Sequence, residues 1–277
     1  MLSFSQVVTS RQNPTVKRIC ALSEKKNRYA QNLFRFDGIK LFGEAVGNGL
    51  NIEYAVVREN APQRIFEEVA ELVKCGKLRE ESVLTVSGSV FEKISEERSP
   101  EGIITVAHFG KNIRFVKDMG ELCVNGGERI LIAESLRDTG NLGTVIRSCA
   151  ALGIDRLIIT DDCADVYNSK TVRAAMGGLF RLKTDIVEHS ALPRFIKDLR
   201  AGGRAVYAAA LRENDLVLGE AELENGFCFV IGNEGHGLSE SVIGACDACV
   251  IIPMSEGSES LNAAAAAAIC IWETVRQ

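Results

Sequence analysis

The chain has 277 residues, of which 46% are hydrophobic and 25% charged, and its formal net charge is -5. This length accommodates two ordinary domains, and the composition is typical of a folded globular protein rather than a disordered one. No apolar run approaches the 18 residues of a membrane-spanning helix, and the N-terminal residues lack the basic-then-apolar order of a secretory signal. We therefore expect a cytoplasmic protein with no membrane partner.

The strands and helices expected over residues 1–107 alternate, which predicts a small α/β domain. In chain order the sequence predicts a basic helix at 16–29, a strand at 34–38, a helix at 39–48, a strand at 52–57, a helix at 62–75, a strand at 82–86, a short helix at 89–94 and a strand at 102–107. Residues 108–127 are interpreted as a linker with one helix or turn.

The first 40 residues are basic, although the whole chain is acidic. They hold two acidic residues, Glu24 and Asp37, against eight basic ones: Arg11, Lys17, Arg18, Lys25, Lys26, Arg28, Arg35 and Lys40. Such a segment is typical of a phosphate-binding surface. It is equally typical of a solvated helix face, and charge alone does not separate these two interpretations.

A second α/β domain is expected over residues 128–277. The sequence predicts, in chain order, a strand at 129–133, a polar loop at 134–143, a helix at 144–152, a strand at 157–160, a polar loop at 161–171, helices at 173–180 and 195–201, strands at 205–209, 227–231 and 249–253, and an alanine-rich helix from about 261. Because parallel strands need crossover connections, this alternation predicts a mainly parallel sheet.

Two of these expected strands end in loops of small residues. The strand at 227–231 ends at Gly232, the first of three glycines within six residues, where the backbone can approach a ligand closely. The strand at 249–253 leads into the loop 255–260. Ligands of parallel sheets bind outside the carboxyl ends of the strands, so these loops predict one shared binding site.

Polar side chains beside these glycines are suited to orienting a ligand in an apolar pocket. They are Glu234, Ser260 and Asn262. His236 follows Gly235 in the turn, and we expect it to brace the loop rather than to act as a catalytic base.

The nine cysteines are scattered along the chain, several of them inside apolar runs. This distribution predicts small buried side chains in a reducing compartment. Cys246 and Cys249 form a CxxC pair, but no second pair or nearby histidine completes a zinc site. We predict no metal site.

Three segments fit an ordered set of motifs. Residues 141–147 fit NxGxxxR, residues 231–238 fit IGNExxGL, and residues 252–254 with 260–262 fit IPM…SLN. Each motif is weak alone, but in this order they resemble the three motifs of the SpoU (TrmH-like) class of SPOUT RNA ribose 2'-O-methyltransferases.

The resemblance extends to the first domain, which is similar to that family's N-terminal substrate-binding domain at 9–14, 36–38 and 99–102. Two residues depart from the family pattern: Glu256 stands where small residues are frequent, and Ala263 where valine is frequent. Both departures leave the polar residues of the motifs intact.

The resemblance implies a particular fold and assembly. Residues 128–277 would form a trefoil-knotted parallel-sheet SPOUT methyltransferase domain, residues 1–107 a smaller α/β RNA-binding domain, and two chains a homodimer. Chain knots are rare, and the residue pattern by itself does not suggest one.

The resemblance also implies the cofactor S-adenosyl-L-methionine. Carried over to this sequence, Gly232, Ile252 and Leu261 would contact it, with Ile231 and Met254 alongside.

The catalytic residues implied by the resemblance are centred on Arg147, the family's candidate for drawing the proton from the ribose 2'-hydroxyl. Asn141, Glu234, Ser260 and Asn262 would complete the catalytic set, with the last three orienting Arg147 and the ribose. A guanidinium stays protonated and is a poor general base. A phosphate clamp or a stabiliser of the developing alkoxide therefore remains an alternative role for Arg147.

RNA is the implied substrate because only RNA carries the 2'-hydroxyl, with ribosomal RNA expected first and transfer RNA as the alternative. A non-catalytic RNA-binding relative is a further alternative, against which the retention of Arg147 and its polar neighbours argues. A dinucleotide-dependent oxidoreductase would need a GxGxxG turn, which residues 139–143 do not match.

Overall fold

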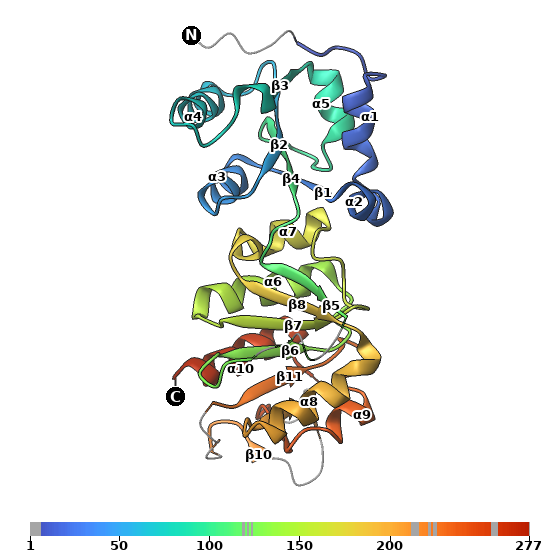
Figure 1. Cartoon of the computed structure of the whole chain (residues 1–277), viewed down its shortest axis with the longest axis vertical. Coiled ribbons are helices and arrows are strands. Elements are labelled where there is room, and N and C mark those ends of the chain that lie inside the picture. Colours follow the sequence, from blue (N-terminus) through green and yellow to red (C-terminus); the bar gives the residue numbers. More distant parts are fainter. Residues whose placement is uncertain are drawn as a thin grey trace. The chain divides into compact units, whose positions relative to one another are not determined.

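The computed structural model describes residues 7–117, 120, 122, 124–211, 216–220, 223, 226–255 and 260–276 (Figure 1). Glu256 and the rest of the loop 256–259 lie outside the described residues. The chain forms two compact units: unit 1 comprises Met1–Gly110 and Tyr167–Phe180, and unit 2 comprises Lys111–Val166 and Arg181–Gln277. These units differ from the expected division at 107 and 128, because 167–180 groups with unit 1 and most of the expected linker with unit 2.

Within the described residues of unit 1, four strands form a mixed sheet in the order β1-β4-β2-β3. They are β1 (Leu33–Asp37), β2 (Ile52–Arg58), β3 (Val83–Val86) and β4 (Ile103–His108). β4 is antiparallel to both of its neighbours, whereas β2 and β3 are parallel. All four strands agree with the expected ones to within one residue at each end.

The helices of unit 1 are α1 (Pro14–Ala21), α2 (Lys25–Gln31), α3 (Ile39–Gly47), α4 (Gln63–Lys74), η1 (Glu80–Ser82), α5 (Gly88–Ile94), α7 (Ser169–Ala175) and η3 (Gly178–Phe180). Of these, α1 and α5 contribute to an apolar core against the sheet, which includes Val16 and Ile19 of α1, Phe91 of α5 and Val106 of β4.

The single basic helix expected at 16–29 is instead two helices, α1 and α2, separated at residues 22–24. The buried Arg28 donates from Nη1 to the carbonyl oxygens of Leu22 and Ser23, both at 2.8 Å. These bonds satisfy carbonyl groups at the end of α1 that would otherwise lack helical partners, and so they stabilise the break.

Two of the eight basic residues in 1–40 are buried and bond within unit 1, so their side chains are not exposed for binding RNA. Arg28 is buried, and so is Arg35, whose Nη2 lies 2.6 Å from Oε1 of Glu96. Nη1 of Arg35 also donates to the carbonyl oxygen of Ile19 at 3.3 Å. The other six basic side chains are exposed: Arg11, Lys17, Arg18, Lys25, Lys26 and Lys40.

Residues 167–180 join unit 1 through aromatic and charged contacts. The ring of Tyr167 stacks on Phe109 with centroids 3.8 Å apart. Arg173 of α7 forms an ion pair with Glu97 at 3.0 Å. Because their partners precede them by more than 50 residues, no local pattern placed these residues in unit 1.

Within the described residues of unit 2, eight strands form one sheet in the order β10-β12-β9-β11-β6-β7-β8-β5, and every neighbouring pair is parallel. The strands are β5 (Ile113–Val116), β6 (Ile130–Ala133), β7 (Arg156–Thr160), β8 (Lys183–Val187), β9 (Val206–Ala209), β10 (Leu216–Val217), β11 (Cys228–Ile231) and β12 (Ala248–Ile251). The expected parallel sheet is confirmed.

Strands β5, β8 and β10 were not expected from the sequence. β8 carries Asp185, whose carboxylate is fully buried and pairs with Arg156 of β7 and with Arg114 of β5, the latter at 2.8 Å. Charged residues interrupt the apolar pattern by which buried strands are recognised. Burial of the Asp185 carboxylate is favourable only because it forms ion pairs with arginines on the neighbouring strands.

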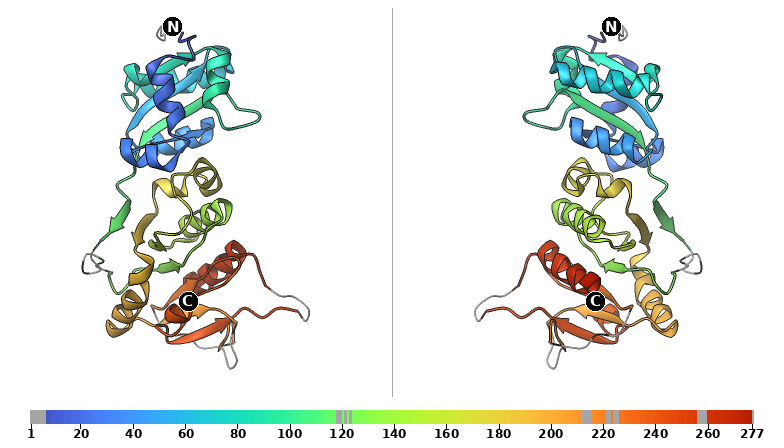
Figure 2. Two further views of the ribbon diagram at one scale, coloured as in Figure 1. Left: turned by 90° about the vertical axis from the view of Figure 1, so that its right-hand side faces the viewer. Right: turned by 90° about the vertical axis from the view of Figure 1, so that its left-hand side faces the viewer.

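Helices cover both faces of the unit 2 sheet (Figure 2). α6 (Thr139–Leu152) packs against α10 (Ala263–Arg276) on one face. On the other face α8 (Leu192–Ala201) and α9 (Glu240–Ile243) share an apolar core with β6, and η4 (His189–Ala191) precedes α8. Among the described helices, none is long and apolar enough to cross a membrane. The trefoil knot stays a prediction.

Candidate active site

A cavity of about 410 Å³ lies where the chain leaves β11 and β12. Both strands flank β9 in the sheet, so their carboxyl ends open at the same edge. Each residue that the sequence predicted to contact the cofactor lines this cavity: Ile231, Gly232, Ile252, Met254 and Leu261. Glu234 and Ser260 of the predicted catalytic set line it as well.

The loop after β11 folds back on itself at Gly232. A Cβ atom at this position would lie 2.4 Å from the carbonyl carbon of Gly237 and 2.5 Å from the backbone nitrogen of Leu238. Asn233 and Gly237 exchange two backbone hydrogen bonds, each of 3.0 Å, which close the turn. Glycine is therefore required at 232 for the close approach of two backbone segments.

Glu234 connects this loop to the start of α6. Its carboxylate accepts hydrogen bonds from the backbone nitrogens of Arg137 at 3.3 Å and Asp138 at 3.2 Å, and from Nδ2 of Asn141 at 3.1 Å. Burial by itself raises the pKa of the Glu234 carboxyl, but these hydrogen bonds outweigh it and hold the pKa below its ordinary value. Glu234 is thus ionised and acts as a hydrogen-bond acceptor at neutral pH.

Asn141 lies in the first turn of α6 rather than in the loop expected at 134–143. Oδ1 of Asp138 accepts from the backbone nitrogen of Asn141 at 2.8 Å, which caps the helix and starts it at Thr139. The expected start was residue 144.

Asn262 joins the third motif to the first. Its Nδ2 donates to Oδ1 of Asn141 at 2.9 Å. Its Oδ1 accepts from the backbone nitrogens of Ala264 at 2.9 Å and Ala265 at 3.3 Å, at the start of α10. These bonds fix the orientation of both side-chain amides and make Asn262, Asn141 and Glu234 one hydrogen-bonded chain.

Arg147 and Ser260 are not part of that hydrogen-bonded chain. Arg147 lies on α6 with an exposed side chain, and it makes no hydrogen bond or ion pair with any residue in the described part of the protein. Ser260 is exposed on the cavity wall. The structure thus brings together three of the five predicted catalytic residues and leaves these two available to a ligand.

Asn233 is a further residue of the site to which the sequence analysis gave no role. Its Oδ1 accepts from the backbone nitrogens of Gly235 at 2.9 Å and His236 at 3.1 Å, and its Nδ2 donates to the carbonyl oxygen of Ser135 at 2.7 Å. Asparagine side chains commonly bond to backbone two residues on in turns, so its place among glycines was a usable signal. His236 braces the loop as expected, and it also lines the cavity.

Metal ligation has no geometric basis in this part of the structure. Among the described residues, no three His, Cys, Asp or Glu side chains are grouped to hold a metal ion. Cys246 of the CxxC pair is buried, which raises the pKa of its thiol to about 12, and its Sγ donates to the carbonyl oxygen of Val242.

Comparison with known families matches both halves of the chain. The model of the SpoU rRNA Methylase family matches residues 128–272, and that of the MRM3-like substrate binding domain matches residues 13–105.

Individual proteins match over nearly the full length. The 23S rRNA (guanosine(2553)-2'-O)-methyltransferase RlmP of Bacillus subtilis is 30% identical over 96% of this chain and 97% of its own. The AdoMet-bound rRNA methyltransferase from Sinorhizobium meliloti superimposes with a TM-score of 0.80 at 28% identity, covering 98% of this chain and 97% of that one. The SpoU methyltransferase AviRb from Streptomyces viridochromogenes, in complex with AdoMet, superimposes with a TM-score of 0.78 at 25% identity over 96% and 98%.

Proposed function

The chain belongs to the SpoU rRNA methylase family, and from that premise we propose that its 410 Å³ cavity holds S-adenosylmethionine beside a ribose-binding site built on Glu234. The enzyme is an S-adenosylmethionine-dependent RNA 2'-O-methyltransferase, and its relatives favour ribosomal RNA over transfer RNA as the substrate. The observation that carries the proposal is that Glu234 belongs both to the cavity wall and to the hydrogen-bonded chain with Asn141 and Asn262.

The cavity fits the cofactor in size and in lining. Pockets for ligands of this size commonly measure about 300–1,000 Å³ and are mainly apolar with a few polar groups. Here apolar side chains of Ile231, Ile252, Met254 and Leu261 face the folded loop at Gly232, where a side chain would fill space that the backbone occupies. S-adenosylmethionine, once bound, supplies a methyl group already activated by its sulfonium charge.

The protein's own residues then orient the acceptor ribose. Glu234 and Asn262 hold the side-chain amide of Asn141 rigid, so that no side chain has to reorganise when RNA binds. Ser260, exposed on the cavity wall, offers a hydroxyl to the ribose or to the cofactor. The guanidinium of Arg147 stabilises the negative charge that develops on the 2'-oxygen as the methyl group is transferred to it, and the hydroxyl proton passes to solvent water.

The exposed basic residues of α1 and α2 form the RNA backbone contact in this proposal. Lys17 lies on α1, and Lys25 and Lys26 begin α2, all with exposed side chains. Exposed positive charges bind phosphates without regard to sequence, which leaves the choice of nucleotide to unit 2.

A homodimer formed through α10 is also part of the proposal. Ile269 and Trp272 lie three residues apart on one face of this helix and are 38% and 57% exposed. Such a stripe is typical of a surface that a second chain covers. We expect Trp272→Arg to convert a dimer to a monomer in light scattering, and an unchanged mass would contradict this assignment. The cytoplasmic location, expected from the sequence because it shows no membrane-spanning run and no secretory signal, stays a prediction.

The direct test is transfer of labelled methyl from S-adenosylmethionine to cellular RNA, followed by separation of the RNA by size and digestion with alkali. We expect the label in alkali-resistant dinucleotides from the ribosomal fraction, because a 2'-O-methyl group blocks alkaline cleavage. Label in the transfer RNA fraction would overturn the choice of substrate. Cofactor binding without transfer to any RNA would support a non-catalytic relative instead.

A further inference from the structure

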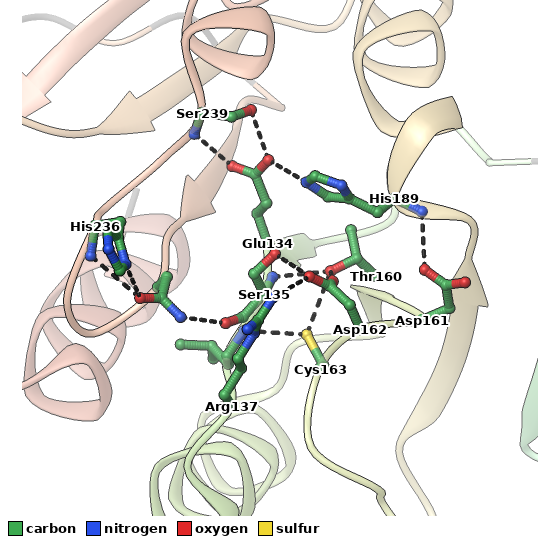
Figure 3. Close-up of polar contacts among 12 residues, drawn as sticks. Glu134, Ser135, Arg137, Thr160, Asp161, Asp162, Cys163, His189, His236 and Ser239 are labelled. Atoms are coloured by element: carbon green, nitrogen blue, oxygen red, sulfur yellow. Dashed lines mark hydrogen bonds and ion pairs between the residues drawn. The ribbon is translucent and has the colours of Figure 1, made fainter.

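A second carboxylate, that of Glu134, lies behind the cavity wall and has no role so far. It follows β6 directly and is 2% exposed. Three donors surround it: the backbone nitrogen of Ser239 at 2.9 Å, Oγ of Ser239 at 2.6 Å and Nε2 of His189 at 2.8 Å (Figure 3). Because a carboxylate oxygen is the acceptor in this contact, Nε2 of His189 is the donor.

Ser239 is the residue through which Glu134 reaches the cavity. It ends the glycine loop and is the N-cap of α9, where its Oγ accepts from the backbone nitrogen of Val242 at 3.4 Å. Glu240 and Ile243 of α9 line the cavity. By holding Ser239, Glu134 fixes the N-terminal end of this short helix, while Val242 packs its other side into the apolar core.

The segment 134–138 holds the glycine loop at two further points. Ser135 accepts from Nδ2 of Asn233 at 2.7 Å, and the backbone nitrogens of Arg137 and Asp138 donate to Glu234. The start of the loop, at Asn233 and Glu234, and its end, at Ser239, are thus anchored to four of the five residues that follow β6.

The anchoring segment is itself rigid. Ser135 has a left-handed φ of 54°, which is unfavourable for a residue with a side chain and persists only where other contacts enforce it. Its Oγ donates to Oδ2 of Asp162 at 2.6 Å, and its backbone nitrogen donates to Oγ1 of Thr160 at 2.8 Å (Figure 3). Through this segment the loop is therefore held in a fixed position relative to β6 and β7.

We propose that Glu134 is a positioning residue for the cofactor, which presets the cavity by fixing Ser239 and α9 before S-adenosylmethionine binds. This inference rests on the proposed assignment of the cavity to S-adenosylmethionine. Loss of the anchor leaves α9 and the end of the loop to be ordered by the ligand, at the expense of affinity. The effect then falls on binding of the cofactor, while the chemistry at Arg147 is unaffected once the site is saturated.

Glu128 offers a matched control at the opposite end of the same strand. It precedes β6, is only partly exposed and pairs with Arg156 at 3.0 Å and with Lys183 at 3.2 Å. It resembles Glu134 in residue type and in its several donors, but neither Arg156 nor Lys183 belongs to the loop after β11 or to α9.

The experiment measures S-adenosylmethionine binding by calorimetry, together with Tm, kcat and KM, for the full chain and for Glu134→Ala, Glu134→Gln and Glu128→Ala. We expect Glu134→Ala to weaken binding about tenfold, the equivalent of one buried hydrogen bond, and to raise KM while kcat at saturation stays within about twofold. Glu134→Gln should recover part of the affinity, since its amide reaches the same groups. Glu128→Ala should lower Tm and bind as the wild type does.

Wild-type affinity in Glu134→Ala, or an equal loss in Glu128→Ala, would overturn the inference, the latter by showing that any destabilisation of β6 weakens binding. If Glu134→Ala does not fold, Ser239→Ala removes one of the same bonds, and an unchanged affinity there is equally contradictory. Ile252→Asp separates the two proposals, because it places a charge in the cavity. Wild-type binding in Ile252→Asp would overturn the cavity assignment. If Ile252→Asp loses binding while Glu134→Ala keeps the wild-type affinity, only the role of Glu134 is overturned.

Discussion

Asn262 donates its side-chain amide to Oδ1 of Asn141 across 2.9 Å, although 121 residues separate the two in the chain. Asn141 in turn donates from its own Nδ2 to the carboxylate of Glu234 at 3.1 Å. A side-chain amide carries both an acceptor oxygen and a donor nitrogen, so Asn141 can accept from Asn262 and donate to Glu234. The three motifs are thereby joined through a single residue.

Asn141→Asp should lower kcat at least about tenfold while S-adenosylmethionine binding stays within about twofold. The new carboxylate can still accept from Asn262, but it replaces the donor that faces Glu234 with a second negative charge. Methyl transfer at saturating cofactor measures the effect. Asn48→Asp, on an exposed part of unit 1, is the control, and unchanged kcat in Asn141→Asp would contradict the proposed role.

Arg147→Ala should retain cofactor binding and lose methyl transfer, by about 100-fold or more, the usual scale for removing a group that stabilises developing charge. Arg147→Lys should recover part of the rate because it keeps the charge without the planar fork. Single-turnover methyl transfer measures both variants. The control is Arg194→Ala, whose side chain on α8 is 84% exposed. Turnover at the wild-type rate in Arg147→Ala would refute its assignment.

Gly232→Ala should abolish cofactor binding, because its methyl group would overlap the backbone of Gly237 and Leu238 and force the loop open. Gly235→Ala is the matched control three residues on. A Cβ there meets only Oδ1 of Asn233 at 3.6 Å, an ordinary contact. Calorimetric titration with S-adenosylmethionine should therefore separate the two variants, and equal affinities would show that the close approach at Gly232 is not needed.

Replacing Lys25 and Lys26 together with alanine should weaken RNA binding and reduce its salt dependence. Each lost phosphate contact reduces the slope of log K against log salt by about 0.7–0.9, so the slope should change by about 1.5. The control replaces Lys74 and Lys77 with alanine. Both are also exposed in unit 1, so the control removes the same amount of positive charge from another part of that unit. Equal slopes for the two double variants would argue against a specific basic surface on α2.

Asp37 should make unit 1 less stable as the pH rises. Burial raises the pKa of its carboxyl to about 6, while the hydrogen bond from Oγ of Ser95 at 2.7 Å opposes this shift. Since the folded-state pKa lies above the unfolded value of 3.8, the stabilisation is complete below that pH and is lost as the pH rises through about 6.

Two pKa units correspond to about 3 kcal/mol, so the free energy of unfolding should fall by roughly that amount from this residue between pH 4 and pH 7. Asp37→Asn removes the titrating carboxyl and with it this pH dependence. The free energy of unfolding of the variant should therefore increase relative to that of the wild type as the pH rises. Urea unfolding of both proteins at pH 4 and pH 7 measures the difference. A constant difference between them would contradict the prediction.

The sequence by itself determined much of this protein. Apolar runs of strand length identified the four strands of unit 1 to within a residue, and the alternation of strands with helices indicated the parallel sheet of unit 2. The ordered motifs also selected five of the residues that line the cavity, because these motif residues lie in the loops that follow β11 and β12. These features are local, and local features are legible in a single sequence.

Only the tertiary structure decided the rest. Asp185 is a strand residue because Arg156 and Arg114 neutralise it from adjacent strands. The bonds of Glu134 to Ser239, like that of Asn262 to Asn141, join residues more than 100 positions apart. Their physical basis is the folded sheet, which places strand ends side by side, and no local propensity records which distant side chains will meet there.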